Sequence, residues 1–363
     1  KVYHPSEITL HVIYPSYLDR HVRDFVEDLT SGCDGWDDEK DFPGFNKTNP
    51  PFYSKLIVAY YPQRPPNLIR YKTCTMGIKS KYKTGDNVIL FILPDSTSSS
   101  FYHELKRLCY QHNLASQFVR PETIRRTKGR AAILWNIAIA LYTKAGGTPW
   151  KIGTDLLDFA ECYIGLQCKI QRRGKAGRGD FFIGSADIFN AFGEYISCAL
   201  HQGLTKSPDG LHVDSEFMES LIKKAVERYR EEVGSYPARV VIHRKVEFND
   251  EEIRGVEKGL KDLKVFAPCF LVHLQENNLF RGYYIGDPNL FVPRTAYFLI
   301  GPRNAILFIT GLTEGRYEGF GTPKPTQINI RVINRHEEIT PFDIEKICKG
   351  VIGFTRLRWN TTR

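Results

Sequence analysis

The chain has 363 residues, a length that corresponds to two domains at about 150 residues per domain. It is 42% hydrophobic and 25% charged, as soluble globular proteins are, and this composition excludes disordered and fibrous chains. Fifty Lys and Arg against 41 Asp and Glu give a formal net charge of +9, which favours polyanionic partners if the positive charge is clustered.

The sequence predicts a cytoplasmic protein without a membrane span. Its longest apolar stretch, 131–142, is too short to cross a bilayer and is interrupted by Asn136. The eight cysteines include no CxxC pair and several lie in apolar runs, so we expect reduced thiols. The ten histidines form no HExxH motif and no Cys/His cluster, which argues against a structural zinc site.

The first third of the chain alternates strand and helix patterns. They occur in the order strand 8–14, helix 17–29, strand 88–93, helix 101–113, strand 116–119 and helix 131–144. This rhythm indicates a small parallel α/β domain with helices on both faces of its sheet. The last helix is apolar on nearly every side, so we expect it to be buried between layers or domains. Residues 146–149, Gly-Gly-Thr-Pro, mark the predicted boundary.

The rest of the chain has a different order of elements. Three strands form a meander at 162–170, 181–188 and 194–201. They are followed by a helix at 214–233, a strand at 239–243, a helix that starts from Asn249, a strand at 265–273, further strands and a last helix at 341–355. Glu252, three residues after Asn249, completes a capping box. This is the order of an RNase H-like domain, so the predicted fold class is α/β, a Rossmann-like domain followed by an RNase H-like domain.

Five polar residues of the first domain make a candidate anion site. Tyr102 and Lys106 lie four residues apart on one face of a helix, and Gln117 lies in the strand that follows. Asn136 and Lys144 lie eight residues apart on the next long helix. Two ammonium groups, two amides and an aromatic ring suit a terminal phosphate with a stacked base. The alternative is a solvated helix face, but Asn136 in an otherwise apolar helix is costly unless a partner satisfies its amide.

The segments that carry these residues resemble a known family. The run YHELKRLCYQHNLASQFV (102–119), followed by NIAIALYTKAGGTPW (136–150), is similar to the MID domain of Argonaute and Piwi proteins, whose pocket holds the 5′ end of a guide strand. The resemblance implies four ligands of the guide 5′-phosphate and one contact to the guide nucleotide: Tyr102, Lys106, Gln117 and Lys144, and Asn136. Ala140 stands where many eukaryotic members have a second lysine. Several prokaryotic members share this departure, so the resemblance points to the prokaryotic type.

The second domain resembles the Piwi domain, an RNase H-like fold that cuts the strand paired to the guide when carboxylates hold two divalent metals. The strand YIGLQC (163–168) has Gln167 where such enzymes have an Asp, and VVIHRKV (240–246) has Lys245 in place of an acid. GTPKPTQINI (321–330), which matches the segment of the last metal ligand, offers Gln327 or Asn329. An amide and an ammonium group cannot hold two metals, so the resemblance implies a catalytically inactive protein.

The alternative is an RNase H-like nuclease with an atypical metal site built from acids such as Asp180, Asp187 or Glu194. The Gln167 and Lys245 pair argues against it. The resemblance further implies Mg²⁺ at the guide 5′-phosphate and no catalytic metal. Members of the family bind the phosphate-site ion with help from a C-terminal carboxylate, whereas this chain stops at Arg363.

Two groups of basic residues are candidate contacts to a nucleic-acid backbone. One group precedes the 131–144 helix and the other lies in the run 169–178: Arg125, Arg126 and Lys128, and Arg172, Arg173 and Lys175. For the second group, a solvated hairpin loop is an equally good interpretation.

Together these patterns predict a MID domain at 1–148 and a PIWI domain at 149–363, either as a short MID–PIWI protein or as the C-terminal half of a longer one. We expect the chain to bind a guide RNA or DNA and to pair it with a complementary target strand without cleaving the target. We expect the target to be DNA. An alternative is an interaction module whose pocket has decayed.

A guide-binding protein without chemistry of its own acts through something else, so we expect an associated effector protein and, by resemblance, a role in host defence. The aromatic- and proline-rich stretch 42–66 is the candidate docking surface for that partner. The alternative for this stretch is a surface loop packed on the core of its own domain.

Overall fold

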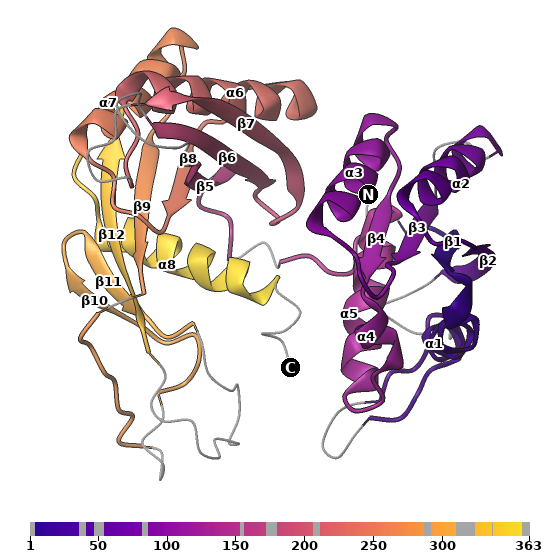
Figure 1. Ribbon diagram of the computed structural model, residues 1–363. Coiled ribbons are helices and arrows are strands. Elements are labelled where there is room, and N and C mark those ends of the chain that lie inside the picture. Colours follow the sequence, from indigo (N-terminus) through magenta and orange to yellow (C-terminus); the bar gives the residue numbers. More distant parts are fainter. Residues whose placement is uncertain are drawn as a thin grey trace. The chain divides into compact units, whose positions relative to one another are not determined.

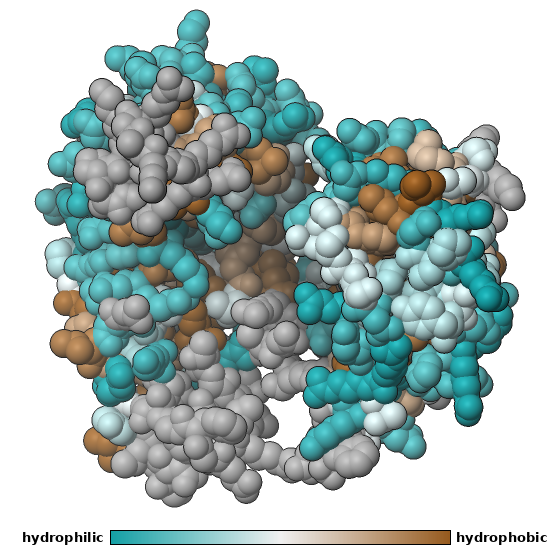
Figure 2. All heavy atoms as spheres, viewed as in Figure 1, coloured by the Kyte–Doolittle hydropathy of each residue, from teal (hydrophilic) through white to brown (hydrophobic). Residues whose placement is uncertain are grey.

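A computed structural model describes most of the chain, namely residues 4–35, 41–46, 54–81, 86–152, 156–171, 180–205, 211–276, 278–286, 292–309, 324–335 and 337–357. The chain divides into two units, 1–150 and 151–363, whereas the sequence placed the division after residue 148. On the face shown in Figure 2, hydrophilic residues make up most of the coloured surface. No helix within the described ranges is long and apolar enough to cross a membrane.

The first unit alternates strands and helices. In chain order it contains β1 (Glu7–Pro15), a 3-10 turn η1 (Ser16–Leu18), α1 (Asp19–Ser31), β2 (Lys55–Gln63), α2 (Leu68–Lys81), β3 (Asn87–Ile92), α3 (Ser99–Gln111), β4 (Ser116–Val119), α4 (Pro121–Arg125) and α5 (Arg130–Lys144). Its described strands form one sheet in the order β2-β1-β3-β4, with every neighbouring pair parallel. The predicted parallel α/β domain is confirmed (Figure 1).

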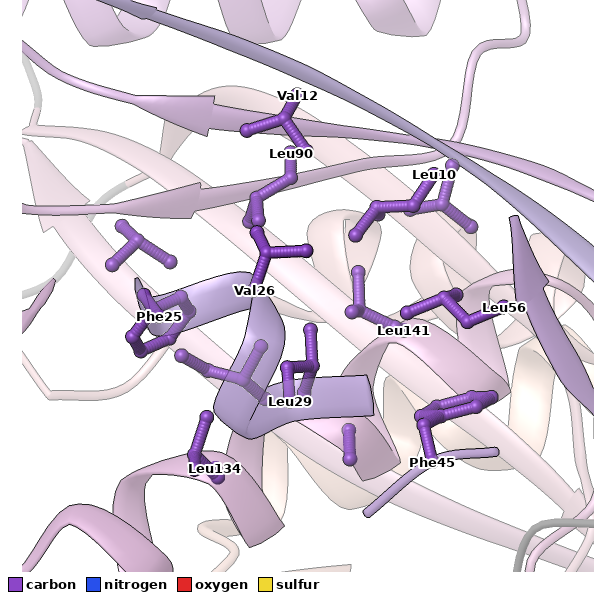
Figure 3. Close-up of a cluster of buried hydrophobic side chains, with 14 of the residues drawn as sticks. Leu10, Val12, Phe25, Val26, Leu29, Phe45, Leu56, Leu90, Leu134 and Leu141 are labelled. Atoms are coloured by element: carbon purple, nitrogen blue, oxygen red, sulfur yellow. The ribbon is translucent and has the colours of Figure 1, made fainter. Parts of the chain in front are cut away.

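Helices cover both faces of this sheet, as a parallel sheet requires. On one face, the strand residues Leu10, Val12 and Leu90 pack against side chains of α1 and α5 (Figure 3). On the other face, residues of β1 and β3 pack against α2 and α3 in a separate cluster that includes Tyr71 and Leu105. The alternation of side chains along each strand therefore decides which helix layer a strand residue meets.

The stretch 42–66 is not a continuous loop. Its residues 55–63 form β2, the edge strand that pairs in parallel with β1. Phe42 and Phe45 are fully buried in the core of the first unit. Phe42 and Phe45 therefore pack on the core of their own domain, as the alternative interpretation expects. Only the exposed residues around them remain candidates for docking a partner.

The second unit contains a long meander followed by mixed elements. In chain order these are β5 (Cys162–Gln171), β6 (Asp180–Asn190), β7 (Tyr195–Thr205), α6 (Ser215–Val233), β8 (Val240–Arg244), α7 (Asp250–Asp262), β9 (Cys269–Gln275), β10 (Tyr297–Gly301), β11 (Asn304–Leu307), β12 (Thr326–Ile333) and α8 (Pro341–Arg356). The described strands form one sheet in the order β10-β11-β12-β9-β8-β5-β6-β7.

The central strands β5, β8 and β9 are parallel, and β6 and β7 extend the sheet as an antiparallel meander. Helices α6 and α7 pack over one face of this sheet and α8 packs over the other (Figure 1). This is the predicted RNase H-like arrangement. Two boundaries differ by four residues. Strand β7 runs to Thr205 rather than to residue 201. Strand β9 begins at Cys269 rather than at residue 265, because Lys264 has a left-handed φ of 57° and Pro268 has no N–H to donate to a ladder.

The predicted capping box at the start of α7 is present. The Asn249 side chain accepts from the backbone N–H of Glu252, and the Glu252 carboxylate accepts from the backbone N–H of Asn249. The same carboxylate forms a 2.6 Å ion pair with Arg244 at the end of β8, with side-chain exposures of 0% and 2%. Glu252 thus joins the helix start to the central strand inside the core.

Candidate phosphate-binding site

Strand β4 lies at one edge of the first sheet, and polar side chains from both helix layers meet along it. Ser116 and Phe118 lie on the face that α3 covers, and Gln117, between them, lies on the opposite face. Lys106 is on α3 and Lys144 is the last residue of α5. The two lysines therefore approach the same edge strand from opposite sides of the sheet.

The α3 side of this site is held by contacts to β4. The Lys106 ammonium donates to the Ser116 hydroxyl at 3.2 Å and lies 5.8 Å from the centroid of the Phe118 ring. The Tyr102 ring packs edge-on against the same Phe118 ring at 4.8 Å between centroids. Phe118 thus fixes both α3 side chains relative to the strand.

The α5 side is held by Gln117. The Lys144 ammonium donates to Gln117 Oε1, and Gln117 Nε2 donates to the backbone carbonyl of Phe118 at 3.0 Å. Burial, and to a smaller extent the positive charge of Lys106, lower the pKa of Lys144 to about 8. A second cation close enough to disfavour the charge on Lys144 indicates that both ammonium groups face one region, where an anion would stabilise both.

Two cavities of the first unit adjoin these residues. Lys106, Ser116 and Lys144 line a cavity of about 830 Å³ at the amino ends of the strands. Tyr102 lines a second cavity of about 520 Å³, which Phe118 and the segment after β3 also border. The four predicted phosphate ligands are thus joined by contacts along β4, but Tyr102 faces a different cavity from the two lysines.

No described hydrogen bond or ring contact links Asn136 to the four predicted phosphate ligands. Its side chain is exposed, and its amide donates to the backbone carbonyl of Ala132 one turn earlier at 2.8 Å. This local hydrogen bond satisfies the amide that the sequence left without a partner. The role of Asn136 as a guide-nucleotide contact stays a prediction.

The candidate backbone contacts are placed unequally. Arg125 is paired with Asp95, with Nη2 donating to Oδ2 at 3.0 Å, and so already has a carboxylate partner. Arg126 and Lys128 are exposed on the segment between α4 and α5. The other group, Arg172, Arg173 and Lys175, lies outside the described residues.

Gln167 and Lys245, which the resemblance predicts to stand in place of nuclease carboxylates, lie on β5 and directly after the adjacent strand β8. The parallel pairing of β5 with β8 runs to Gly165 and His243; Gln167 lies two residues further along β5, and Lys245 directly follows the end of β8 at Arg244. Lys245 is exposed and forms an ion pair with Glu276 at 2.5 Å. On β12, Gln327 Nε2 donates to Asn329 Oδ1 at 3.4 Å. These positions offer neutral amides and an ammonium group instead of carboxylates, and the ammonium group repels Mg²⁺.

The acids of the alternative metal site are dispersed. Glu194 pairs with Lys151 and accepts a hydrogen bond from Asn190 at 2.8 Å. Asp187 is exposed on β6, and the side chain of Asp180 lies outside the described part. Within the described ranges, no group of three or more His, Cys, Asp or Glu side chains is placed to hold a metal ion.

The described lining of the 830 Å³ cavity does not fit a magnesium ion held by protein side chains. It contains three lysines, Lys79, Lys106 and Lys144, and no carboxylate. Mg²⁺ takes carboxylate, carbonyl and water oxygens, and ammonium groups repel it. The side chains at this cavity suit an anion.

Sequence reasoning missed Lys79 and His112, which line the same cavity. Lys79 lies on α2, a helix that the sequence did not predict, so its spacing in the sequence could not indicate that it lines the same cavity as Lys106. His112 follows α3 directly, within the run that carries the resemblance, but it had no partner in the sequence pattern.

Comparisons with known proteins agree with the fold. The Piwi domain family matches residues 88–261, from β3 of the first unit to α7 of the second. The Argonaute protein of Cereibacter sphaeroides (strain ATCC 17025 / ATH 2.4.3) is 22% identical over 293 residues, which cover 74% of this chain and 36% of that protein. The structure of Clostridium butyricum Argonaute bound to a guide DNA and a 19-mer target DNA matches with a TM-score of 0.68 and 18% identity, covering 99% of this chain and 46% of that one.

The chain thus spans less than half the length of either protein. Its two-unit α/β fold and its sequence match the same family, as the resemblance predicted. This chain is similar in sequence and fold to prokaryotic Argonaute proteins, and the Piwi domain family matches its residues 88–261.

Proposed function

We propose that the chain anchors the 5′-phosphate of a guide strand beside β4 and pairs the guide with a complementary strand without cutting it. The observation that carries the proposal is the convergence of Lys106 and Lys144 on one edge strand from opposite faces of the sheet. A relative of the same fold has been solved with a guide DNA and a target DNA bound. That likeness supports a nucleic-acid ligand for this chain.

A terminal phosphate matches the electrostatics of the site. Its dianion offers several acceptor oxygens and neutralises two ammonium groups that disfavour each other's charge. In the proposed complex, base pairing reads the sequence and the protein holds the backbone through positive charge, so guide RNA and guide DNA both remain candidates. We take the target to be DNA.

The proposal of binding without cleavage rests on Gln167 and Lys245. Two-metal hydrolysis needs carboxylates at these neighbouring strand positions, and an ammonium group there opposes a divalent cation. The rival function, a nuclease with an atypical metal site, needs three acids or histidines brought together. The described positions of Asp187 and Glu194 do not favour it.

A binding protein without chemistry acts through an associated effector protein, and we propose such a partner and a role in host defence. We also place this action in the cytoplasm. The eight cysteines, all of them in the described ranges, are free thiols, which a reducing compartment preserves.

The anchoring function is tested by comparing one oligonucleotide with a 5′-phosphate and with a 5′-hydroxyl. Each charge-assisted hydrogen bond contributes about 1.5–3 kcal/mol, so Lys106→Ala or Lys144→Ala should weaken binding of the phosphorylated guide about tenfold or more. Binding of the hydroxyl guide should change little. Filter binding at fixed salt measures both.

Arg107→Ala is the matched control, because Arg107 is the next cation on α3 but pairs with Glu104 and does not line the cavity. It should bind like the parent. If both lysine variants also bind the phosphorylated guide like the parent, the site is wrongly assigned.

A further inference from the structure

The cavity beside Lys106 and Lys144 continues across the sheet. Three residues in lateral register form a row along its floor, Ser116 on β4, Ile89 on β3 and His11 on β1. The last turns of α2 and α3 wall it, and its volume is about 830 Å³. A single phosphate at the lysine pair would occupy only the β4 end of this space.

The far wall carries its own cation. Lys79, in the last turn of α2, is exposed, and its ammonium donates to His112 Nδ1 at 2.8 Å. His11 lies at the floor, where burial lowers its pKa, and its Nε2 is hydrogen-bonded to Asn87 Oδ1 at 3.0 Å. Three lysines therefore border one cavity whose described lining includes no Asp or Glu. The charge of the cavity exceeds what one phosphate dianion neutralises.

We propose that this cavity accepts a 5′-triphosphate end, with one phosphate at Lys106 and Lys144 and the outer phosphates toward Lys79. The inference rests on the proposed function, because it takes the guide 5′ end to lie at the lysine pair. It extends that function by naming a chemical class of guide, strands that keep the triphosphate with which synthesis begins. Lys79 would then increase the affinity for the outer phosphates of a triphosphate and would not affect binding of a single phosphate.

A purely structural role of these lysines makes a different prediction. Lys79 and Lys144 lie in the last turns of α2 and α5, where a cation complements the helix dipole. In that role Lys79→Ala would lower stability slightly and change all guides alike. Only a phosphate ligand makes the effect depend on how many phosphates the guide carries.

The experiment compares one oligonucleotide sequence with a 5′-hydroxyl, a 5′-monophosphate and a 5′-triphosphate against the parent chain and Lys79→Ala. We expect the parent to bind the triphosphate about tenfold more tightly than the monophosphate, as one added charge-assisted contact allows. Lys79→Ala should remove this advantage and leave monophosphate affinity unchanged, and Lys79→Arg should keep it. Arg70→Ala, an exposed cation on the same helix that does not line the cavity, should behave as the parent.

The outcomes separate the two proposals. A parent that prefers the monophosphate to the hydroxyl but binds the triphosphate no more tightly overturns the inference and leaves the proposed function in place. A Lys79→Ala variant that weakens all three ligands equally also overturns it. A parent that binds hydroxyl and monophosphate equally contradicts the proposed function itself.

Discussion

Lys144 holds its proton less firmly than an ordinary lysine. Burial and the nearby charge of Lys106 lower its pKa to about 8, so its ammonium form is lost as the pH rises through that value. The guide phosphate has its second pKa near 6 and stays a dianion over this range. We therefore expect the affinity for a 5′-phosphorylated guide to fall between pH 7 and pH 9, measured by equilibrium binding at constant ionic strength.

Lys144→Arg supplies the control for this pH dependence, because a guanidinium keeps its charge throughout. The affinity of this variant for the phosphorylated guide should change less with pH than that of the parent. An equal pH dependence in the two proteins would contradict the role of Lys144. In the unbound protein, the contribution of Lys144 to stability should instead increase with pH. Since folding lowers the pKa of Lys144 from 10.5, this group adds to the free energy of unfolding as pH rises from about 8 to 10.5.

The site residues show what sequence reasoning can and cannot reach. The sequence grouped Lys106, Gln117 and Lys144 by their spacing in a recognisable run, and the structure brings them together along β4, while their role as phosphate ligands stays a prediction. The separation of Tyr102 into a neighbouring cavity could not be predicted, because four-residue spacing places two side chains on one helix face without saying which cavity each one lines.

Among the elements, α7 depends on a buried charge pair. Replacing Glu252 by Ala would leave Arg244 buried without its carboxylate and would remove the carboxylate half of the capping box. Losing one partner of a buried pair costs about 3–5 kcal/mol, so we expect a loss of that size in the free energy of unfolding. Denaturant unfolding of the parent and the variant measures it.

Glu251→Ala is the matched control on the same helix turn. Glu251 is exposed and pairs at 2.9 Å with Arg254, which is also exposed, so its removal should change stability by less than about 0.5 kcal/mol. Equal effects of the two variants would show that the buried pair has no special part in the stability of α7.

The strand pair β5 and β8 carries the prediction on cleavage. A guided complex should leave a matched target intact with Mg²⁺ or Mn²⁺, because Gln167 and Lys245 replace two of the required acids. Gln167→Asp alone should stay inactive, since Lys245 still repels the metals. Gel analysis of a labelled target measures this, and a cut opposite the middle of the guide by the parent chain would refute it.

The sequence did not predict α2 or β2, because their hydrophobic patterns are interrupted. On α2 the buried stripe includes Thr75, whose hydroxyl donates to the Tyr71 carbonyl at 2.8 Å, so a polar residue interrupts the apolar periodicity. Strand β2 lies at the sheet edge and ends beside Pro62, and its mixed exposure hides the strand pattern. Strands and helices with uninterrupted patterns, such as β3 and α6, were predicted within a few residues.

For the whole molecule, we expect a stoichiometric protein partner. A guide-binding chain that cuts nothing needs an effector to produce an effect, and exposed residues of 42–66 are the candidate contact. Co-purification of the native protein from its host, followed by mass spectrometry, tests this. Recovery of a guide-loaded chain without a protein partner would argue against an effector.

The two lysines that meet at β4 belong to helices on opposite faces of one sheet. A phosphate held by both would therefore be a noncovalent cross-link between the helix layers on the two faces of the sheet. Sliding of α3 against α5 would then break charge-assisted contacts as well as apolar packing. If the proposed anchoring holds, loading a guide should stiffen the edge of the first sheet, and we expect the amide protons of β4 to exchange with solvent more slowly in the loaded chain.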